Sequence, residues 1–287
     1  MPIRSEHEGI SFTGLLPGYS GKREDFEDAE NSLFRFCRGF LLCRERGLEI
    51  NSHFTERAFA GGYALYIHDM LAVDAAADEE TGVWVLGVAY FTSEEYEGAD
   101  ESESAVLKRA LEDSEENFYR ALDHLAGRYA VLARRGEKLF AVNDPCGLKT
   151  VYYSPKAECV GSHLALVNLA ARAGLSEIET LSRREGYRYS YAYPGNSTCY
   201  EGIFLMIPNF SLSLGDYSVK RFFPRETLIK TDDIYAVRCR FLEAMRFSMR
   251  RLLKKGKKIC MSLTGGRDSK VCFYATREYK DDIFYFT

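Results

Sequence analysis

The sequence predicts an α+β domain built largely from antiparallel sheet, followed by the beginning of an α/β domain. Up to residue 225, short runs of aromatic and β-branched residues alternate with turn residues, which is typical of strands that pair antiparallel. Close to the C-terminal end, a strand-like run, a Gly-Gly loop and a helical pattern follow one another. The 287 residues suit two domains at about 150 residues each, and we place them at 1–225 and 226–287.

Composition narrows the class of protein. Hydrophobic residues make up 46% of the chain and charged residues 28%, which suits a folded globular protein rather than a disordered or fibrous one. The formal net charge of −4 argues against a general polyanion binder. Neither a secretory signal pattern nor an apolar run of about 18 residues occurs, so we expect a cytoplasmic protein that does not enter a membrane. Eight cysteines without a C-x-x-C pair predict reduced thiols, most of them small core residues.

The first part of the chain is predicted from its strand-like runs. Residues 1–30 carry glycine and proline breakers and predict loop. Strands are expected where aromatic or branched residues cluster, at 33–36, 40–43, 54–60, 63–67 and 83–90. The acidic, serine-containing stretch 92–104, which includes Glu103, predicts a solvated surface loop.

A helix and a strand meander come next. Apolar residues at spacings of three and four predict one helix over 107–125, ended by Gly127. Short apolar runs separated by turn residues then predict strands at 129–133, 139–142 and 151–153. A further helix starts within 162–169, and 200–214 is strand-like with a turn at Pro208 and Asn209.

The second domain is predicted to open with a long helix. Thr231 is a suitable N-cap, and apolar residues from Ile234 to Leu253 recur on one stripe. The helix ends in a basic run, which comprises Arg246, Arg250, Arg251, Lys254, Lys255, Lys257 and Lys258. Because cations are favoured at a helix C-terminus and the chain as a whole is acidic, we interpret this run as a solvated face or a rim near a phosphate. Nucleic acid is disfavoured as a partner.

The chemistry is predicted to lie after this helix. An apolar run of strand length, 259–263, is followed by the loop Thr264-Gly265-Gly266-Arg267-Asp268-Ser269, and a helix opens at Lys270. Two glycines let backbone N–H groups approach a phosphate, and the positive end of the helix adds attraction. Thr264 and Ser269 can donate hydroxyl hydrogen bonds, and Asp268 can hold Mg²⁺ against phosphate oxygens. The alternative interpretation is a turn in which Asp268 or Ser269 only caps the helix.

This loop is not a Walker A loop, because the spacing G-x-x-x-x-G-K is absent. It resembles the S-G-G-x-D-S signature of the PP-loop ATP pyrophosphatases, with Thr264 in place of the first serine. Four further strings resemble landmarks of the asparagine synthetase-like family and occur in that family's order. They are 125–130 (LAGRYA), 143–153 (NDPCGLKTVYY), 161–166 (GSHLAL) and 200–208 (YEGIFLMIP). The resemblance covers about residues 120–287.

This resemblance implies a fold, a reaction and a set of ligands. The N-terminal domain would be similar to a class II glutamine amidotransferase of the Ntn-hydrolase type, and the second domain to a PP-loop ATP-binding domain. The reaction would join a small-molecule or peptide carboxylate to an amine through an acyl-adenylate, with release of pyrophosphate. ATP and Mg²⁺ would be the ligands, with Asp268 on the metal. The residues implied for ATP and pyrophosphate are Leu263, Thr264, Gly265, Gly266, Asp268 and Ser269.

Two departures from the family change this expectation. Position 2 is Pro2, the N-terminal cysteine nucleophile of the family is missing, and so is its N-G-E signature. We therefore expect no glutamine hydrolysis and assign no catalytic residue, a loss that resembles β-lactam synthetase-like and lasso-peptide cyclase-like members. The segment after Asp232 is shorter than the well over about 100 residues that a doubly wound domain needs. We expect a truncated chain that is inactive alone.

Several alternatives stay open at this point. One is a non-catalytic nucleotide-binding or interaction module, and another is one half of a split synthetase that a C-terminal chain completes. Whether the chain is an enzyme, and whether it forms the homodimer that the resemblance implies, is open as well. His68 and His163 are expected to be structural, and Cys146 and Cys199 carry no assigned chemistry.

Overall fold

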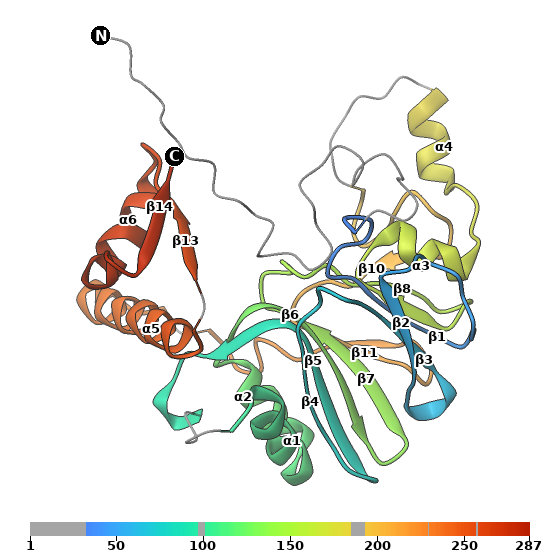
Figure 1. Ribbon diagram of the computed structural model, residues 1–287, viewed down its shortest axis with the longest axis horizontal. Coiled ribbons are helices and arrows are strands. Elements are labelled where there is room, and N and C mark those ends of the chain that lie inside the picture. Colours follow the sequence, from blue (N-terminus) through green and yellow to red (C-terminus); the bar gives the residue numbers. More distant parts are fainter. Residues whose placement is uncertain (1–32, 97–100, 185–192, 229, 257) are drawn as a thin grey trace. The chain divides into compact units, whose positions relative to one another are not determined.

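The computed structural model describes residues 33–96, 101–184, 193–228, 230–256 and 258–287 (Figure 1). The loop expected over 1–30, Pro2 and Lys257 lie outside the described residues. The chain folds into two compact units. Unit 1 comprises the described residues up to Ala72 and Val151–Leu205, and unit 2 comprises Val73–Thr150 and Met206–Thr287. Both units contain antiparallel sheet and helices, which confirms the predicted α+β class. The domain boundary at residue 225 stays a prediction.

Unit 1 contains a six-stranded antiparallel sheet in the order β10-β8-β9-β1-β3-β2. Its strands are β1 (Phe40–Cys43), β2 (Phe54–Ala58), β3 (Ala64–His68), β8 (Tyr152–Ser154), β9 (Cys159–Gly161) and β10 (Phe204–Leu205). A 3₁₀ turn, Ala60–Gly62, joins β2 to β3, and the helices are α3 (Leu164–Ala171) and α4 (Glu177–Arg184). The strands predicted at 40–43, 54–60, 63–67 and 151–153 and the helix starting within 162–169 are confirmed.

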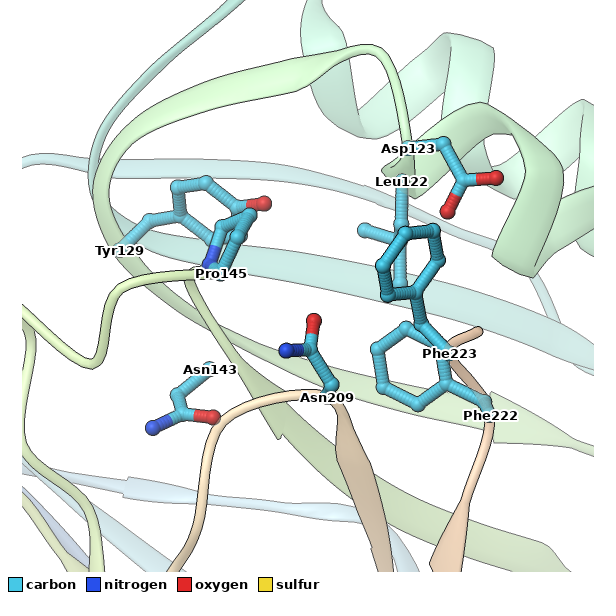
Figure 2. A pocket seen from close by; sticks show the side chains of 8 residues that line it. All are labelled: Leu122, Asp123, Tyr129, Asn143, Pro145, Asn209, Phe222 and Phe223. Atoms are coloured by element: carbon cyan, nitrogen blue, oxygen red, sulfur yellow. The ribbon is translucent and has the colours of Figure 1, made fainter. Parts of the chain in front are cut away.

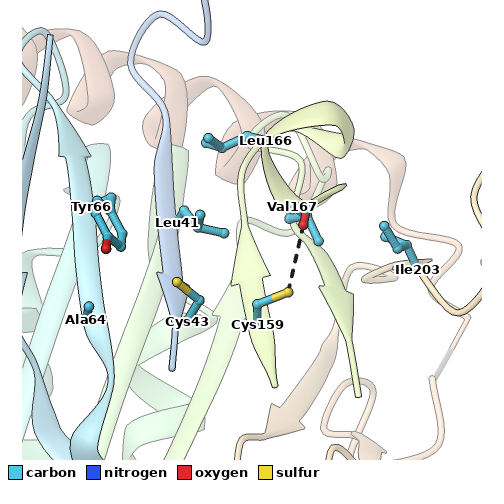
Figure 3. Packing of buried hydrophobic residues seen from close by; sticks show 8 residues of the cluster. All are labelled: Leu41, Cys43, Ala64, Tyr66, Cys159, Leu166, Val167 and Ile203. Carbon is cyan, nitrogen blue, oxygen red and sulfur yellow. Dashed lines mark hydrogen bonds between the residues drawn. The ribbon is translucent and has the colours of Figure 1, made fainter. Parts of the chain in front are cut away.

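One face of this sheet carries the core of unit 1 (Figure 3). The residues that meet there are Leu41, Cys43, Ala64, Tyr66, Cys159, Leu166, Val167 and Ile203. Leu166 and Val167 come from α3, which packs on β8 and β9. Because side chains of a strand alternate between faces, the cluster takes every second residue of β1 and β3. Strand pairing and helix packing therefore use the same set of apolar residues.

The strand predicted at 33–36 is wrong. Residues 33–38 form successive turns, in which Cys37 N donates to Phe34 O and Gly39 N donates to Phe36 O. Phe36 and Arg38 both have φ of 56°, in the left-handed region that a strand does not visit. The aromatic residues that favour a strand here are overridden by local backbone hydrogen bonds.

Unit 2 contains a second six-stranded antiparallel sheet, in the order β12-β11-β7-β6-β5-β4. Its strands are β4 (Val73–Ala77), β5 (Thr81–Phe91), β6 (Leu125–Arg135), β7 (Lys138–Asn143), β11 (Phe210–Ser213) and β12 (Val219–Arg221). The helix α1 (Glu103–Asp113) packs on β4 and β5, and α2 (Glu115–Leu122) follows it; a 3₁₀ turn spans Glu94–Tyr96. The strands predicted at 83–90, 129–133 and 139–142 are confirmed, and the turn at Pro208 and Asn209 precedes β11.

The single helix predicted over 107–125 is instead two helices and the start of a strand. Ser114 has extended dihedral angles, ends α1 and caps α2, its Oγ accepting from Asn117 N at 3.1 Å. Leu125 pairs with Phe91 in the sheet. Gly127 does not end a helix: it lies in β6 with φ of +132°, where a Cβ would come within 2.1 Å of Val88 O. The helical spacing continues across the cap because the apolar residues on both sides of it, Leu107, Leu111, Phe118, Leu122 and Leu125, are all buried.

The acidic stretch 92–104 is not a solvated loop throughout. Glu103 is 5% exposed and opens α1, where its carboxylate accepts hydrogen bonds from Lys255 Nζ. Arg251 Nη2 lies 3.6 Å from the same carboxylate, and the Arg251 side chain is 13% exposed. The basic run is therefore not a uniformly solvated face, because two of its cations are paired inside unit 2.

The long helix α5 (Ile234–Lys254) leads to the last elements of unit 2, which are β13 (Ile259–Ser262), α6 (Arg267–Thr276), a 3₁₀ turn (Arg277–Tyr279) and β14 (Ile283–Phe286). The N-cap of α5 is Asp233 rather than Thr231: Asp233 Oδ1 accepts from Ala236 N at 2.9 Å, whereas Thr231 Oγ1 bonds Asp233 N. Phe247 and Met249 are buried, while Ile234 at the start of the stripe is exposed.

Candidate functional site

The predicted phosphate loop connects β13 to α6. β13 and β14 pair in parallel, with Ile259 opposite Ile283 and Ser262 opposite Phe286, and α6 is the crossover between them (Figure 1). The predicted order of strand, loop and helix is thereby confirmed. The helix begins at Arg267, earlier than the expected Lys270, so Asp268 and Ser269 lie in its first turn. Beyond the strand, Leu263 N donates to Phe286 O at 2.8 Å and extends the pairing into the loop.

The two hydroxyl residues of the loop close it on itself. Thr264 Oγ1 and Ser269 Oγ lie 3.0 Å apart, and Ser269 Oγ accepts from Thr264 N at 3.2 Å. Thr264 Oγ1 also accepts from Gly266 N at 3.3 Å. These contacts hold the loop backbone in a compact turn over the start of α6. A ligand that accepted from the two hydroxyls would replace hydrogen bonds that the loop now makes internally.

The conformation and packing of the loop do not require glycine at positions 265 and 266. Gly266 has φ of −67° and ψ of 162°, and Gly265 is not among the described glycines with positive φ. A Cβ built on Gly265 would meet no atom within 4 Å, and one on Gly266 would meet only Thr264 Oγ1 at 3.3 Å and Ser269 Oγ at 4.0 Å. Since neither the backbone dihedral angles nor packing demands glycine, the open space beside Gly265 is the feature that a side chain would remove. That space is what a phosphate approaching backbone N–H groups needs.

The first turn of α6 is available to an anion. Gly266 occupies the N-cap and, among the described residues, no side chain caps this helix. Neither Asp268 nor Ser269 is the cap, so the alternative interpretation of the loop as a capping turn is wrong in that respect. The N–H groups at a helix start have no partner within the helix and carry its positive partial charge. The arrangement supplies donors and open space at one place.

Asp268, the magnesium ligand expected from the sequence, stands without further carboxylate, histidine or cysteine ligands grouped around it in the described part of the chain. Its carboxylate is exposed in the first turn of α6. Within the described residues there is no group of three or more His, Cys, Asp or Glu that could hold a metal ion. Mg²⁺ commonly takes one or two carboxylates, with phosphate oxygens and waters as its other ligands. Asp268 would supply the one protein ligand of such a set.

The two histidines singled out from the sequence have the structural settings expected of them, but the prediction that most cysteines are core residues is wrong, because only Cys43 and Cys159 are buried. His68 is fully buried, with Nε2 bonded to Leu33 O at 2.9 Å and Nδ1 accepting from Met70 N at 3.1 Å. His163 Nδ1 lies 2.8 Å from Ser162 Oγ at the start of α3. Cys146 is an exposed free thiol and Cys199 a half-buried one.

The 143–153 string begins with a turn at the end of β7, built around a buried carboxylate. Asp144 is fully buried, and its carboxylate accepts from the backbone N–H groups of Cys146 at 3.1 Å, Leu148 at 2.9 Å and Lys149 at 2.6 Å. Gly147 has φ of +64° in this turn, which suits glycine. Charge-assisted bonds from three N–H groups account for an aspartate here without any catalytic role.

This turn borders a small cavity of about 90 Å³ in unit 2 (Figure 2). Its lining residues are Leu122, Asp123, Tyr129, Asn143, Pro145, Asn209, Phe222 and Phe223. Burial raises the pKa of the Tyr129 hydroxyl, with Asp144 adding to the effect, and that hydroxyl donates to Leu125 O. Asp123 is paired with Arg225, and Phe222 stacks on Tyr119 at 4.7 Å. Besides its apolar residues, the lining carries the amides of Asn143 and Asn209, and its two other polar groups, on Tyr129 and Asp123, are engaged in the contacts just described.

Sequence reasoning missed one polar group here. Asn143 is 4% exposed, and neither atom of its side-chain amide has a hydrogen-bond partner within the described part of the chain. Figure 2 shows its amide turned away from the two phenylalanine rings. Nothing in the string NDPCGLKTVYY marks this asparagine as unsatisfied, because its surroundings come from distant parts of unit 2.

Comparison with known proteins gives a coarse relationship in fold. No family model and no curated protein matches the chain. Among solved structures, it is similar to the glutamine phosphoribosylpyrophosphate amidotransferase from B. subtilis complexed with ADP and GMP, with 11% identity and a TM-score of 0.35. The match covers 87% of this chain and 59% of that one, so the chain spans under two thirds of the length of its neighbour. A similarity of this size concerns the fold in outline and says nothing of activity. None of the described helices is long and apolar enough to cross a membrane.

Proposed function

We propose that the chain belongs to an asparagine synthetase-like, ATP-dependent carbon–nitrogen ligase, and that the loop 264–269 holds the pyrophosphate part of ATP. We propose further that this ligase has no glutaminase activity. It is supported by five landmark strings in family order and by the strand–loop–helix geometry. The single observation that carries it is the open, uncapped start of α6 beside Gly265.

Each residue of the loop has a role in this proposal. Backbone N–H groups of Gly265, Gly266 and the first turn of α6 donate to phosphate oxygens and favour the negative charge of the leaving pyrophosphate. Asp268 holds Mg²⁺ against the same oxygens. Thr264 and Ser269 keep the loop compact through their mutual contact at 3.0 Å. ATP supplies the activation of a carboxylate, which an amine then attacks.

The proposal is tested by a steric probe at Gly265. Replacing Gly265 with alanine adds a methyl group that meets no protein atom, so the fold stays intact while the phosphate space is filled. In calorimetric titrations with Mg·ATP and with Mg·pyrophosphate, we expect at least about tenfold weaker binding, equivalent to about 1.4 kcal/mol. Gly174→Ala is the matched control, because its Cβ also meets nothing within 4 Å and it lies in unit 1.

Three results separate the alternatives. Equal binding by the parent and Gly265→Ala, or no binding by the parent, contradicts a phosphate site in this loop. Binding together with carboxylate-dependent exchange of pyrophosphate into ATP supports the ligase. Binding without exchange, across a panel of amino and peptide acids, supports a non-catalytic nucleotide-binding module.

A further inference from the structure

Two buried cysteines occupy opposite positions on adjacent strands of unit 1, with their sulfur atoms turned to different partners. β1 and β9 pair antiparallel with Leu41 opposite Gly161 and Leu42 opposite Val160. The next step of the same register places Cys43 opposite Cys159. One residue further, Arg44 Nε lies 3.4 Å from Glu158 Oε2, so the register continues beyond the cysteines.

The type of strand pair follows from the hydrogen bonds. Ser162 N donates to Phe40 O at 3.0 Å, which makes residues 40 and 162 a hydrogen-bonded pair. Bonded and non-bonded pairs alternate along an antiparallel ladder, so 42 and 160 are bonded while 43 and 159 are not. Cα atoms of a non-bonded pair are about 4.5 Å apart and their side chains are close. That separation falls within the roughly 4.4–6.8 Å that a disulfide spans.

The two side chains lie on the same face of the sheet. Both belong to the apolar cluster beneath α3, and both thiols are almost completely buried. Figure 3 shows them level with each other on neighbouring strands, with Cys159 Sγ turned toward Val167 O at 4.0 Å. Cys43 Sγ donates to Glu45 O at 3.3 Å. Both are weak sulfur contacts. Rotating the two side chains toward each other would therefore break only weak hydrogen bonds.

We propose that Cys43 and Cys159 are an oxidation site that closes to a disulfide across β1 and β9. The bond would join covalently the two segments of chain that make up unit 1, one before Ala72 and one after Val151. With glutathione disulfide as oxidant, one thiolate attacks it and releases glutathione as a thiolate. The second thiolate then attacks the protein sulfur of the mixed disulfide and releases another. Two cysteine thiols are oxidised and one glutathione disulfide is reduced to two glutathione thiols.

The folded state sets how fast this site reacts. Burial raises the pKa of the Cys43 thiol to about 11 and that of Cys159 to about 12. Since the thiolate is the reacting species, the folded and reduced chain reacts slowly near neutral pH. Closure is faster while the chain folds, when both thiols still reach solvent. In the folded chain its rate rises with pH.

The experiment uses the full chain with the exposed Cys146 and Cys260 replaced by serine, which removes the two surface thiols. Reduced, unfolded protein is refolded in a glutathione redox buffer, alkylated under denaturing conditions and digested for mass spectrometry. We expect the predominant linked peptide to join Cys43 and Cys159. The oxidised protein should unfold at higher urea concentration than the same protein after reduction. Cys43→Ala and Cys159→Ala should each abolish both the linked peptide and the shift.

The linked-peptide measurement is made on the parent, so it does not depend on how well either alanine variant folds. Recovery of Cys43 and Cys159 as alkylated thiols in refolded protein overturns the proposal. Linkage of either residue to any other cysteine does the same. A second measurement follows the folded, reduced parent with glutathione disulfide over a range of pH. Loss of the mass of two hydrogen atoms, faster at higher pH, is the expected result, and stable glutathione adducts without closure contradict it.

Discussion

The carboxylate of Glu103 and the ammonium group of Lys255 form a partly buried ion pair that joins the first residue of α1 to the end of α5. The Glu103 side chain is 7% exposed, and Arg251 approaches the same carboxylate at 3.6 Å. A carboxylate removed from water needs charged or hydrogen-bonding partners, and this one has two cations. Because α5 leads directly into β13 and the loop after it, the pair also anchors the helix that precedes the candidate site.

Replacing Glu103 with glutamine keeps the shape of the side chain and removes its charge. Lys255 and Arg251 then face a neutral amide in a partly buried place, so we expect the free energy of unfolding to fall by about 2–3 kcal/mol. Urea denaturation followed by far-UV circular dichroism measures the change. Glu94→Gln is the control: its side chain is 81% exposed and 3.9 Å from Arg250, so its loss should change stability by less than about 0.5 kcal/mol. Equal effects of the two substitutions would show that Glu103 is not a buried partner.

Gly127 is predicted to tolerate no side chain. An alanine Cβ would lie 2.1 Å from Val88 O and 3.0 Å from Ala89 Cα, and the φ of +132° is unfavourable for any residue with a Cβ. We expect Gly127→Ala to destabilise the fold by more than about 3 kcal/mol, measured as the urea midpoint. Gly136→Ala is the comparison, because its φ is +57° but its Cβ would meet nothing within 4 Å. That variant should lose only about 1 kcal/mol, and a larger loss there than at Gly127 would contradict the steric argument.

The stability of unit 2 is predicted to fall in acid through Asp78. A hydrogen bond from Lys108, followed by those from Thr81 N and Glu80 N, holds the pKa of the Asp78 carboxyl far below its ordinary value of 3.8. A depressed pKa means that the contribution is present above about pH 4 and is lost as the pH falls below it. Asp78→Asn keeps an oxygen for the two backbone donors and removes the charge. We expect a lower Tm at neutral pH and a flatter decline of Tm below about pH 4.

The control for this pH profile is Asp281→Asn, an exposed carboxylate near the end of the chain. Its profile should follow that of the parent protein. If Asp78→Asn also follows the parent through the acid range, the contact with Lys108 does not stabilise the folded state.

The sequence predicted those parts of the fold that local signals determine. The strands β5, β6 and β7 were predicted because runs of apolar residues and intervening turns are properties of a few neighbouring residues. The order of β13, loop and α6 was predicted for the same reason. By contrast β4, with the sequence VDAAA, lacks branched and aromatic residues, and it is a strand because β5 pairs with its full length.

The parts that sequence reasoning missed depend on distant partners. In the sequence, Glu103 is one of several acidic residues in the stretch 92–104. Its burial depends on its contact with Lys255, which lies 152 residues away in the chain. Ser114 reads as one polar residue inside a helical pattern, although its extended backbone divides α1 from α2. At the candidate site, the composition of the loop was visible in the sequence. The absence of a capping side chain on α6, within the described residues, was not, because it depends on where the helix begins.

Asp268 is predicted to carry the dependence of ATP binding on Mg²⁺. The residue lies in the first turn of α6, where a carboxylate also complements the helix dipole, so two roles have to be separated. Asp268→Asn retains a polar side chain of the same size and removes the charge.

If the carboxylate binds Mg²⁺ held by phosphate oxygens, the Asp268→Asn variant should bind ATP about tenfold more weakly when Mg²⁺ is present, and its ATP affinity should change little when Mg²⁺ is chelated. If it acts only on the helix dipole, the variant should unfold at lower urea concentration and show the same response of ATP affinity to Mg²⁺ as the parent. Calorimetric titrations with and without a chelator, run beside Asp281→Asn, distinguish the two roles.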